Sequence, residues 1–157
     1  MKKKLLGFVA VVGLTMACLT GCGASQVKTI DTAALADDLY GGVTWNDQLG
    51  EIELNKALTL YGIGSDSVAS GKVYMGTNAT AEEVAVLEAA SAEQVAVIED
   101  GIEARIDAQV ASFQSYNAEE VPKLESAYVE TKGNYVIFCV CDDASEAQAI
   151  VDACFAE

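Results

Sequence analysis

The chain contains no histidine, and this absence narrows the chemistry that it can perform. Histidine is the commonest general base near neutral pH and the commonest side-chain ligand for metal ions. The sequence also contains no HExxH or GxSxG motif, and Gly62-Ile63-Gly64-Ser65 is not followed by the Lys-Ser/Thr pair of a phosphate loop. We therefore expect no metal and no cofactor, and the sequence favours a protein that is not an enzyme.

Basic residues are also scarce, with 9 lysines and arginines against 24 acidic residues. Three of the nine lie at residues 2–4, so a mature chain that lost them and none of the acids would carry a net charge of −18. A surface of this kind repels nucleic acid and anionic lipid. The acids form no EF-hand loop. They are dispersed along the sequence, and this dispersal is typical of a solvated surface. A binder of cations or of basic partners is the alternative.

Residues 1–21 have the features of a bacterial lipoprotein signal peptide. The lysines at residues 2–4 precede an apolar run at residues 5–19, which is shorter than the ~20 residues of a transmembrane helix. The run ends in Leu19-Thr20-Gly21-Cys22, which resembles a lipobox. This resemblance implies cleavage before Cys22 and a diacylglyceryl group on its thiol. We expect residues 22–30 to tether the protein to the outer face of the cell membrane. An ordinary signal peptide with a chance cysteine is the alternative.

Three further cysteines, Cys139, Cys141 and Cys154, lie near the C-terminus. An odd number cannot pair completely within one chain. Cys139 and Cys141 share one face of a predicted strand, so a bond between them is disfavoured. We expect buried thiols, and a bridge from one of these two to Cys154 is left open.

Hydrophobic periodicity predicts an α+β fold in one domain, residues 31–157. Apolar residues recur every three or four positions in residues 92–116, which predicts a long helix. We expect an antiparallel sheet of about four strands in a ββαββα core that is covered by helices, with a short helical segment at the N-terminal end. The predicted helices are residues 32–40, 54–61, 92–116 and a last helix that starts at residues 142–145. The predicted strands are residues 68–75, 83–89, 127–130 and 134–141.

Several motifs are similar to a family of small Gram-positive lipoproteins that is classed as domain of unknown function 4358. Besides the leader, they are Tyr61-Gly62-Ile63, Ala79-Thr80-Ala81-Glu82-Glu83-Val84-Ala85-Val86, the run Arg105, Gln109, Phe113 and Tyr116, and Gly133-Asn134-Tyr135-Val136. The resemblance covers the chain from about Ala33 to its end. It implies that residues 83–89 are extended, although their helix propensity is high. The family carries no established activity, cofactor or catalytic residue.

Arg105 is the only arginine of the chain, and it lies at the edge of the apolar stripe of the predicted long helix. Gln109 lies one helical turn further on. One hypothesis is structural, with the arginine stem packed on the core edge and its guanidinium paired with a carboxylate. The other is that Arg105 and Gln109 together bind a carboxylate or phosphate ligand.

These observations together favour a non-catalytic binding or protein-interaction module at the cell envelope. Its expected partners are the membrane, through lipid on Cys22, and an envelope protein or small ligand, but not nucleic acid. One alternative is a hydrolase that uses paired carboxylates on cell-wall sugar. The other alternative is a structural protein of the envelope.

Overall fold

The computed structural model describes residues 27–156. The predicted signal peptide, Cys22 and the beginning of the predicted tether lie outside this range. No helix within residues 27–156 combines the length and the apolar character that crossing a bilayer requires.

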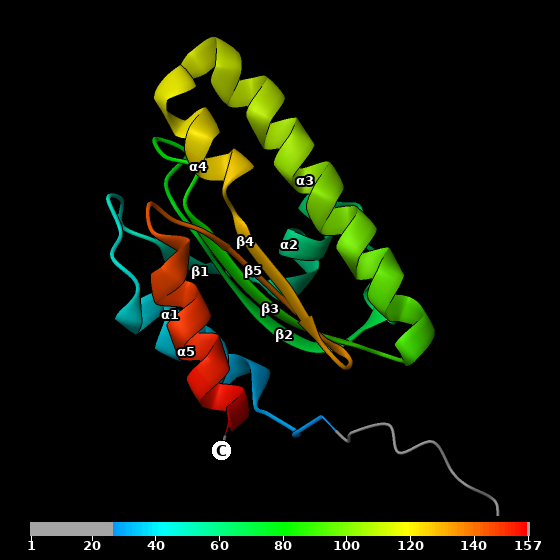
Figure 1. The fold of residues 1–157 in the computed structure, drawn as a ribbon. Coiled ribbons are helices and arrows are strands. Elements are labelled where there is room, and N and C mark those ends of the chain that lie inside the picture. Colours follow the sequence, from blue (N-terminus) through cyan, green and yellow to red (C-terminus); the bar gives the residue numbers. More distant parts are fainter. Residues whose placement is uncertain (1–26, 157) are drawn as a thin grey trace, which may run out of the picture.

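One five-stranded antiparallel sheet forms the middle of the domain (Figure 1). Its strands lie in the spatial order β1-β2-β3-β5-β4, and each neighbouring pair is antiparallel. The strands are β1 Gly50–Ile52, β2 Val68–Met75, β3 Glu83–Ala89, β4 Tyr128–Lys132 and β5 Tyr135–Val140.

Helices cover both faces of the sheet, so the domain has three layers (Figure 1). One face carries α1 Thr32–Gly42 and α5 Ala144–Ala156. The other face carries α2 Leu54–Tyr61, α3 Val95–Tyr116 and α4 Val121–Glu125. Short 3-10 turns precede β2, α3 and α4, at Ser65–Ser67, Ala92–Gln94 and Ala118–Glu120.

Strand β5 supplies side chains to two separate hydrophobic cores. Val136, Phe138 and Val140 pack in the core under α3, whereas Tyr135, Ile137 and Cys139 pack in the core under α1 and α5. Alternate residues of a strand point to opposite faces, so a strand that is apolar throughout must be covered on both. In agreement with this, β5 lies inside the sheet, between β3 and β4. Cys139 and Cys141 are buried free thiols, as expected.

The predicted α+β class, the four main strands and the long helix are confirmed. Residues 83–89 are a strand, buried almost throughout because β3 lies between β2 and β5. The long helix begins with the 3-10 turn at Ala92–Gln94 and becomes α-helical at Val95. Gly133 lies in the turn between β4 and β5 with a φ of 61°, a conformation that favours glycine.

Two details of the sequence prediction were wrong. The first strand was predicted at residues 68–75, but Gly50–Ile52 precedes it and pairs with the end of β2 as a fifth strand. Three residues with a mostly exposed edge carry no alternating pattern. Helix α1 was expected to end at Tyr40, before the two glycines, but it continues through Gly42 because neither glycine adopts a positive φ.

The last residues of the predicted tether lie against the domain at the turn between β4 and β5. Gly133 approaches Val27 so closely that a Cβ atom added to the glycine would lie 3.0 Å from the valine Cβ. Lys28 Nζ donates a hydrogen bond to the carbonyl of Cys154 at 2.8 Å, and the Ile30 amide donates to Tyr135 Oη at 3.3 Å. The chain therefore enters the domain at this end of the sheet.

Candidate functional site

Two adjacent glutamates, Glu82 and Glu83, lie buried at the start of β3. Each residue is only 2% exposed. Because successive side chains of an extended chain point to opposite faces, the two carboxylates need separate sets of partners. A buried charge without partners costs several kcal/mol, so these partners determine the local structure.

Glu83 is held between α2 and α3. Its carboxylate accepts hydrogen bonds from Arg105 Nη2 at 2.8 Å, from Arg105 Nε at 3.2 Å and from Tyr61 Oη at 2.5 Å. Burial raises the pKa of Glu83 above its usual value, and Arg105 and Tyr61 offset part of this effect. Burial, followed by the charge of Glu83, raises the pKa of Tyr61. This group of three joins the helical layer to the sheet.

The structure places Arg105 in an ion pair with Glu83, which agrees with the structural hypothesis for this arginine. The arginine side chain is 13% exposed. Gln109 is half-buried on the same helix, and within residues 27–156 no hydrogen bond joins it to Arg105. The structure therefore does not bring the predicted donor pair together around a common acceptor. Its role in ligand binding stays a hypothesis.

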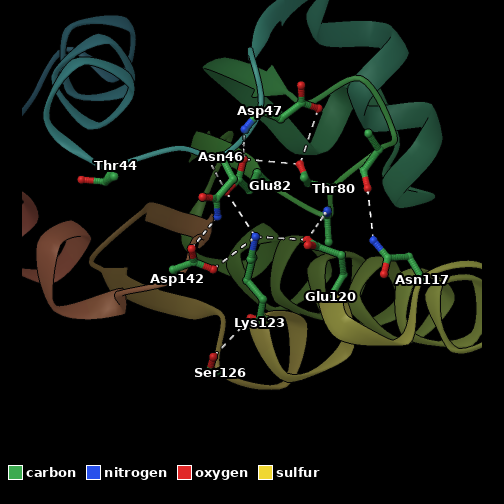
Figure 2. Close-up of polar contacts among 12 residues, drawn as sticks. Thr44, Asn46, Asp47, Thr80, Glu82, Asn117, Glu120, Lys123, Ser126 and Asp142 are labelled. Carbon is green, nitrogen blue, oxygen red and sulfur yellow. Dashed lines mark hydrogen bonds and ion pairs between the residues drawn. The ribbon is translucent and has the colours of Figure 1, made fainter.

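Glu82 fixes the loop between α1 and β1. Its two carboxylate oxygens accept hydrogen bonds from the Asn46 amide at 2.9 and 3.0 Å, and one of them accepts from the Asp47 amide at 2.8 Å (Figure 2). The Thr80 hydroxyl adds a longer contact of 3.3 Å. One buried side chain thus satisfies two backbone donors that belong to a distant loop.

Lys123, on α4, is the counter-ion of Glu82. Its Nζ lies 3.2 Å from Glu82, 3.1 Å from Glu120 and 3.2 Å from Asp142, and its side chain is 6% exposed (Figure 2). Burial alone would lower the pKa of Lys123, but Glu120 and Glu82 outweigh burial and leave that pKa above its usual value. An ammonium group has three protons, so three carboxylates use all of its donors.

Asp142 and Asp47 complete this arrangement at the surface. Asn46 Nδ2 donates to Asp142 at 2.5 Å, and this bond and Lys123 hold the pKa of Asp142 below its usual value. Asp47 accepts hydrogen bonds at 2.7 Å from both the amide and the hydroxyl of Thr77, in the loop between β2 and β3. We call the six residues Asn46, Asp47, Glu82, Glu120, Lys123 and Asp142 the Lys123 cluster.

A hollow of about 370 Å³ lies over the Lys123 cluster. Three separate parts of the chain line it, and most of the lining side chains are polar: Asn46, Glu119, Glu120, Pro122, Lys123, Ser126 and Asp142. Carboxylates outnumber the single ammonium, whose protons are already engaged. The hollow therefore presents hydrogen-bond acceptors and a net negative charge. No group of metal-ligating side chains suited to a metal ion occurs within residues 27–156.

Sequence reasoning did not find the Lys123 cluster. Thr80-Ala81-Glu82-Glu83 has the pattern of a helix capping box, but Glu82 directly precedes and Glu83 begins a strand that is covered on both faces. The adjacent acids Glu82 and Glu83 could have indicated the site, because two buried carboxylates need two cationic partners and this chain has few basic residues. Which cation reaches which acid depends on the fold and could not be read from spacing.

Searches among curated proteins and among solved structures found no match. A family model does match, over residues 46–141. The matched segment contains Glu82, Glu83, Arg105 and Lys123, and it is shorter than the resemblance to residues 33–157 that the sequence motifs suggested. It nevertheless spans more than half of the chain. The protein belongs to the family described as "Domain of unknown function (DUF4358)".

Proposed function

We propose that this protein is a lipoprotein of the outer face of the cell membrane, and that its domain is a non-catalytic binding module. The hollow over the Lys123 cluster is the proposed ligand site. The observation that carries this proposal is that the floor of the hollow is rigidly built. A buried ion pair and backbone hydrogen bonds to Glu82 hold three distant segments together. A site that is preorganised in this way loses little entropy when a ligand binds.

The chemistry of the lining favours a ligand that is cationic and rich in hydrogen-bond donors. Glu119 is exposed and Asp142 is more than half exposed at the rim, so both can accept hydrogen bonds from a ligand. Because Lys123 has no proton left to donate, an anionic ligand would meet only like charges. A primary amine with neighbouring hydroxyl groups, such as an amino sugar, fits this lining.

The course of the N-terminal segment supports a membrane-distal site. Residues 27–30 lie at the turn between β4 and β5, near the C-terminal end of α5 (Figure 1). The Lys123 cluster lies at the opposite end of the same strands, since Glu83 pairs with Val140 and Glu88 pairs with Tyr135. A lipid on Cys22 would hold the first end at the bilayer and leave the hollow facing outward.

The electrostatics favour binding over the carboxylate hydrolase. Such an enzyme needs a carboxylic acid whose pKa is raised, so that it can donate a proton to the leaving group. The pKa of Asp142 is instead lowered by Asn46 and Lys123. Glu83 does have a raised pKa, but it is buried beneath α2 and α3 and bonded to Arg105.

The membrane anchor is tested by metabolic labelling of cells with a fatty-acid analogue. We expect the wild-type chain to be labelled and the Cys22→Ala variant to be unlabelled. The Cys139→Ala variant, which removes a buried thiol, is the matched control and should be labelled normally. Equal labelling of the Cys22→Ala variant would contradict the anchor.

The ligand chemistry is tested by nuclear magnetic resonance titration of the full chain with glucosamine and with glucose. The two sugars differ in one amino group, so the comparison isolates the cationic donor. We expect glucosamine to shift the amide signals of Asn46 and Glu120, while glucose leaves them in place. Equal shifts with both sugars, or none with either, would contradict an amine-binding hollow.

A further inference from the structure

Strand β4 forms an open edge of the sheet. Within residues 27–156, β4 pairs only with β5, along Tyr128–Lys132. An edge strand presents backbone N–H and C=O groups that can pair with an additional strand. The opposite edge, β1, is only three residues long, and short edge strands are one way in which proteins limit such pairing. The β4 edge is therefore better suited than the β1 edge to pair with an additional strand.

A groove of about 430 Å³ runs between β4 and α3. Val129 pairs with Phe138, whose side chain packs in the core under α3, so Val129 points toward the same side. Val129 remains 43% exposed, and together with Ile102 and Ile106 it gives the groove an apolar lining. An apolar groove beside an open edge can receive the side chain of an added strand while the backbones pair.

The rest of the groove lining is acidic. Glu99, Glu103 and Asp107 follow one another at one-turn spacing along α3. On the other side of β4, Asp152 of α5 lies 3.7 Å from Lys132, and Lys132 is also paired with Glu130. Figure 1 shows α3 and α5 on the two sides of β4. A strand added at this edge would therefore lie between acidic side chains, and the nearest lysine is already paired.

We propose that the β4 edge is a docking site for an extended, lysine- or arginine-rich segment of a partner protein, which adds to the sheet as a further strand. Its basic side chains pair with Glu103 and Asp107, and an apolar side chain enters the groove beside Val129. A second copy of this chain would bring the same acids to the same edge, and like charges across an interface oppose association. The site shares no residue with the hollow over the Lys123 cluster, so it goes beyond the proposed ligand site.

The test uses a short fluorescein-labelled peptide of repeated Lys-Lys-Val-Val units, so that each face of the extended peptide carries both lysine and valine. It is titrated by fluorescence anisotropy into the full chain in detergent. A second peptide has the same side chains but carries N-methyl groups on alternate backbone nitrogens, so it keeps the charge and loses the strand hydrogen bonds. We expect the unmethylated peptide to bind about tenfold more tightly. Equal affinities would show attraction by net charge alone and would overturn the proposal.

A matched pair of variants locates the binding. Val129→Lys places a positive charge at the edge, and we expect it to weaken binding of the unmethylated peptide about tenfold. Val97→Lys makes the same change at a valine that is 41% exposed on α3 outside the groove, and we expect unchanged affinity. Equal effects of the two variants would overturn the site. Sedimentation that reveals a dimer of the wild-type chain and a monomer of Val129→Lys would overturn the basic partner in favour of a second copy.

Discussion

Glu83 and Arg105 form a buried ion pair that joins the central strand β3 to the long helix α3. The two guanidinium contacts measure 2.8 and 3.2 Å, and both reach the same carboxylate oxygen. Tyr61 of α2 donates to the other oxygen at 2.5 Å. The only arginine of the chain is therefore used to neutralise one of its most buried acids. Replacing Arg105 therefore tests how much this ion pair contributes to holding α3 on the sheet.

Replacing Arg105 by methionine should destabilise the protein by about 3–5 kcal/mol, because the carboxylate of Glu83 is left buried without a cation. Urea denaturation near neutral pH measures the free energy of unfolding. The control is Lys56→Met, which removes an exposed positive charge on α2 and should change stability by less than about 0.5 kcal/mol. Adding Glu83→Gln to the Arg105→Met variant should recover part of the loss. A double variant that is less stable than Arg105→Met would contradict the pairing.

Replacing Glu82 by alanine should release the loop that contains Trp45. The amides of Asn46 and Asp47 lose their acceptor, and Lys123 loses its most buried partner. Trp45 is the only tryptophan, and its Nε1 donates to the Tyr40 carbonyl at 2.8 Å, so its emission reports on this loop.

We expect the emission of Glu82→Ala to move to longer wavelength before the domain unfolds. The control is Glu51→Ala, which removes a surface partner of Lys72 and should leave the emission unchanged. A wild-type spectrum for folded Glu82→Ala would refute the role of Glu82 in holding the loop.

Gly101 allows α3 to approach the end of α2, and Gly101→Ala should destabilise the protein. A Cβ atom at this position would lie 2.4 Å from Ile63 Cγ1 and 3.0 Å from the Tyr61 carbonyl oxygen. Overpacking of this kind costs about 1–3 kcal/mol, which exceeds the gain of ~1 kcal/mol in helix propensity. Gly41→Ala in α1 is the matched control, since no atom lies within 4 Å of its added Cβ. Thermal unfolding should show a lower midpoint for Gly101→Ala and an equal or higher one for Gly41→Ala. The reverse order would refute the close approach.

The ionisation of Asp47 should make the stability of the fold depend on pH. The hydroxyl and amide of Thr77 hold the pKa of Asp47 below its usual value of 3.8. A carboxyl whose pKa is lower in the folded state stabilises the fold above the unfolded pKa and loses this contribution as the pH falls through the folded pKa. The difference in urea midpoint between wild type and Asp47→Asn should therefore be full near neutral pH, should begin to shrink near pH 3.8 and should continue to shrink as the pH falls through the lowered folded pKa. A difference that stays constant or grows on acidification would contradict this linkage.

The sequence was sufficient for the elements with strong periodicity. The long helix, the strand Tyr135–Val140 and the turn at Gly133 each follow from local chemistry: a repeated apolar spacing, an apolar run and a glycine with positive φ. Strand β1 did not, because its three residues are defined as a strand by their pairing with β2 and carry no pattern of their own. Strand β3 was predicted to be extended although its residues have a high helix propensity. It lies between β2 and β5, and pairing with both strands explains why propensity was overridden.

The candidate site was less accessible to sequence reasoning. Arg105 stood out because it is unique, yet its partner Glu83 is 22 residues away and was not identified. Lys123 has nothing distinctive around it except Pro122. The acids that surround its ammonium group come from the 3-10 turn before α4 and from the loops at one end of β3 and β5. Such sites depend on which loops meet at one end of a sheet, and that is a property of the topology.

The most direct test of the amine-binding hollow compares glucosamine titrations of three chains by the amide shifts of Asn46 and Glu120. Glu119→Gln removes a carboxylate from the rim of the hollow, and Glu125→Gln removes one from the same helical region outside the hollow. The two variants change the net charge equally, so general attraction of a cation to an acidic protein affects them alike. We predict that Glu119→Gln weakens glucosamine binding severalfold and that Glu125→Gln binds like wild type. Equal affinities of all three chains would contradict the proposed site.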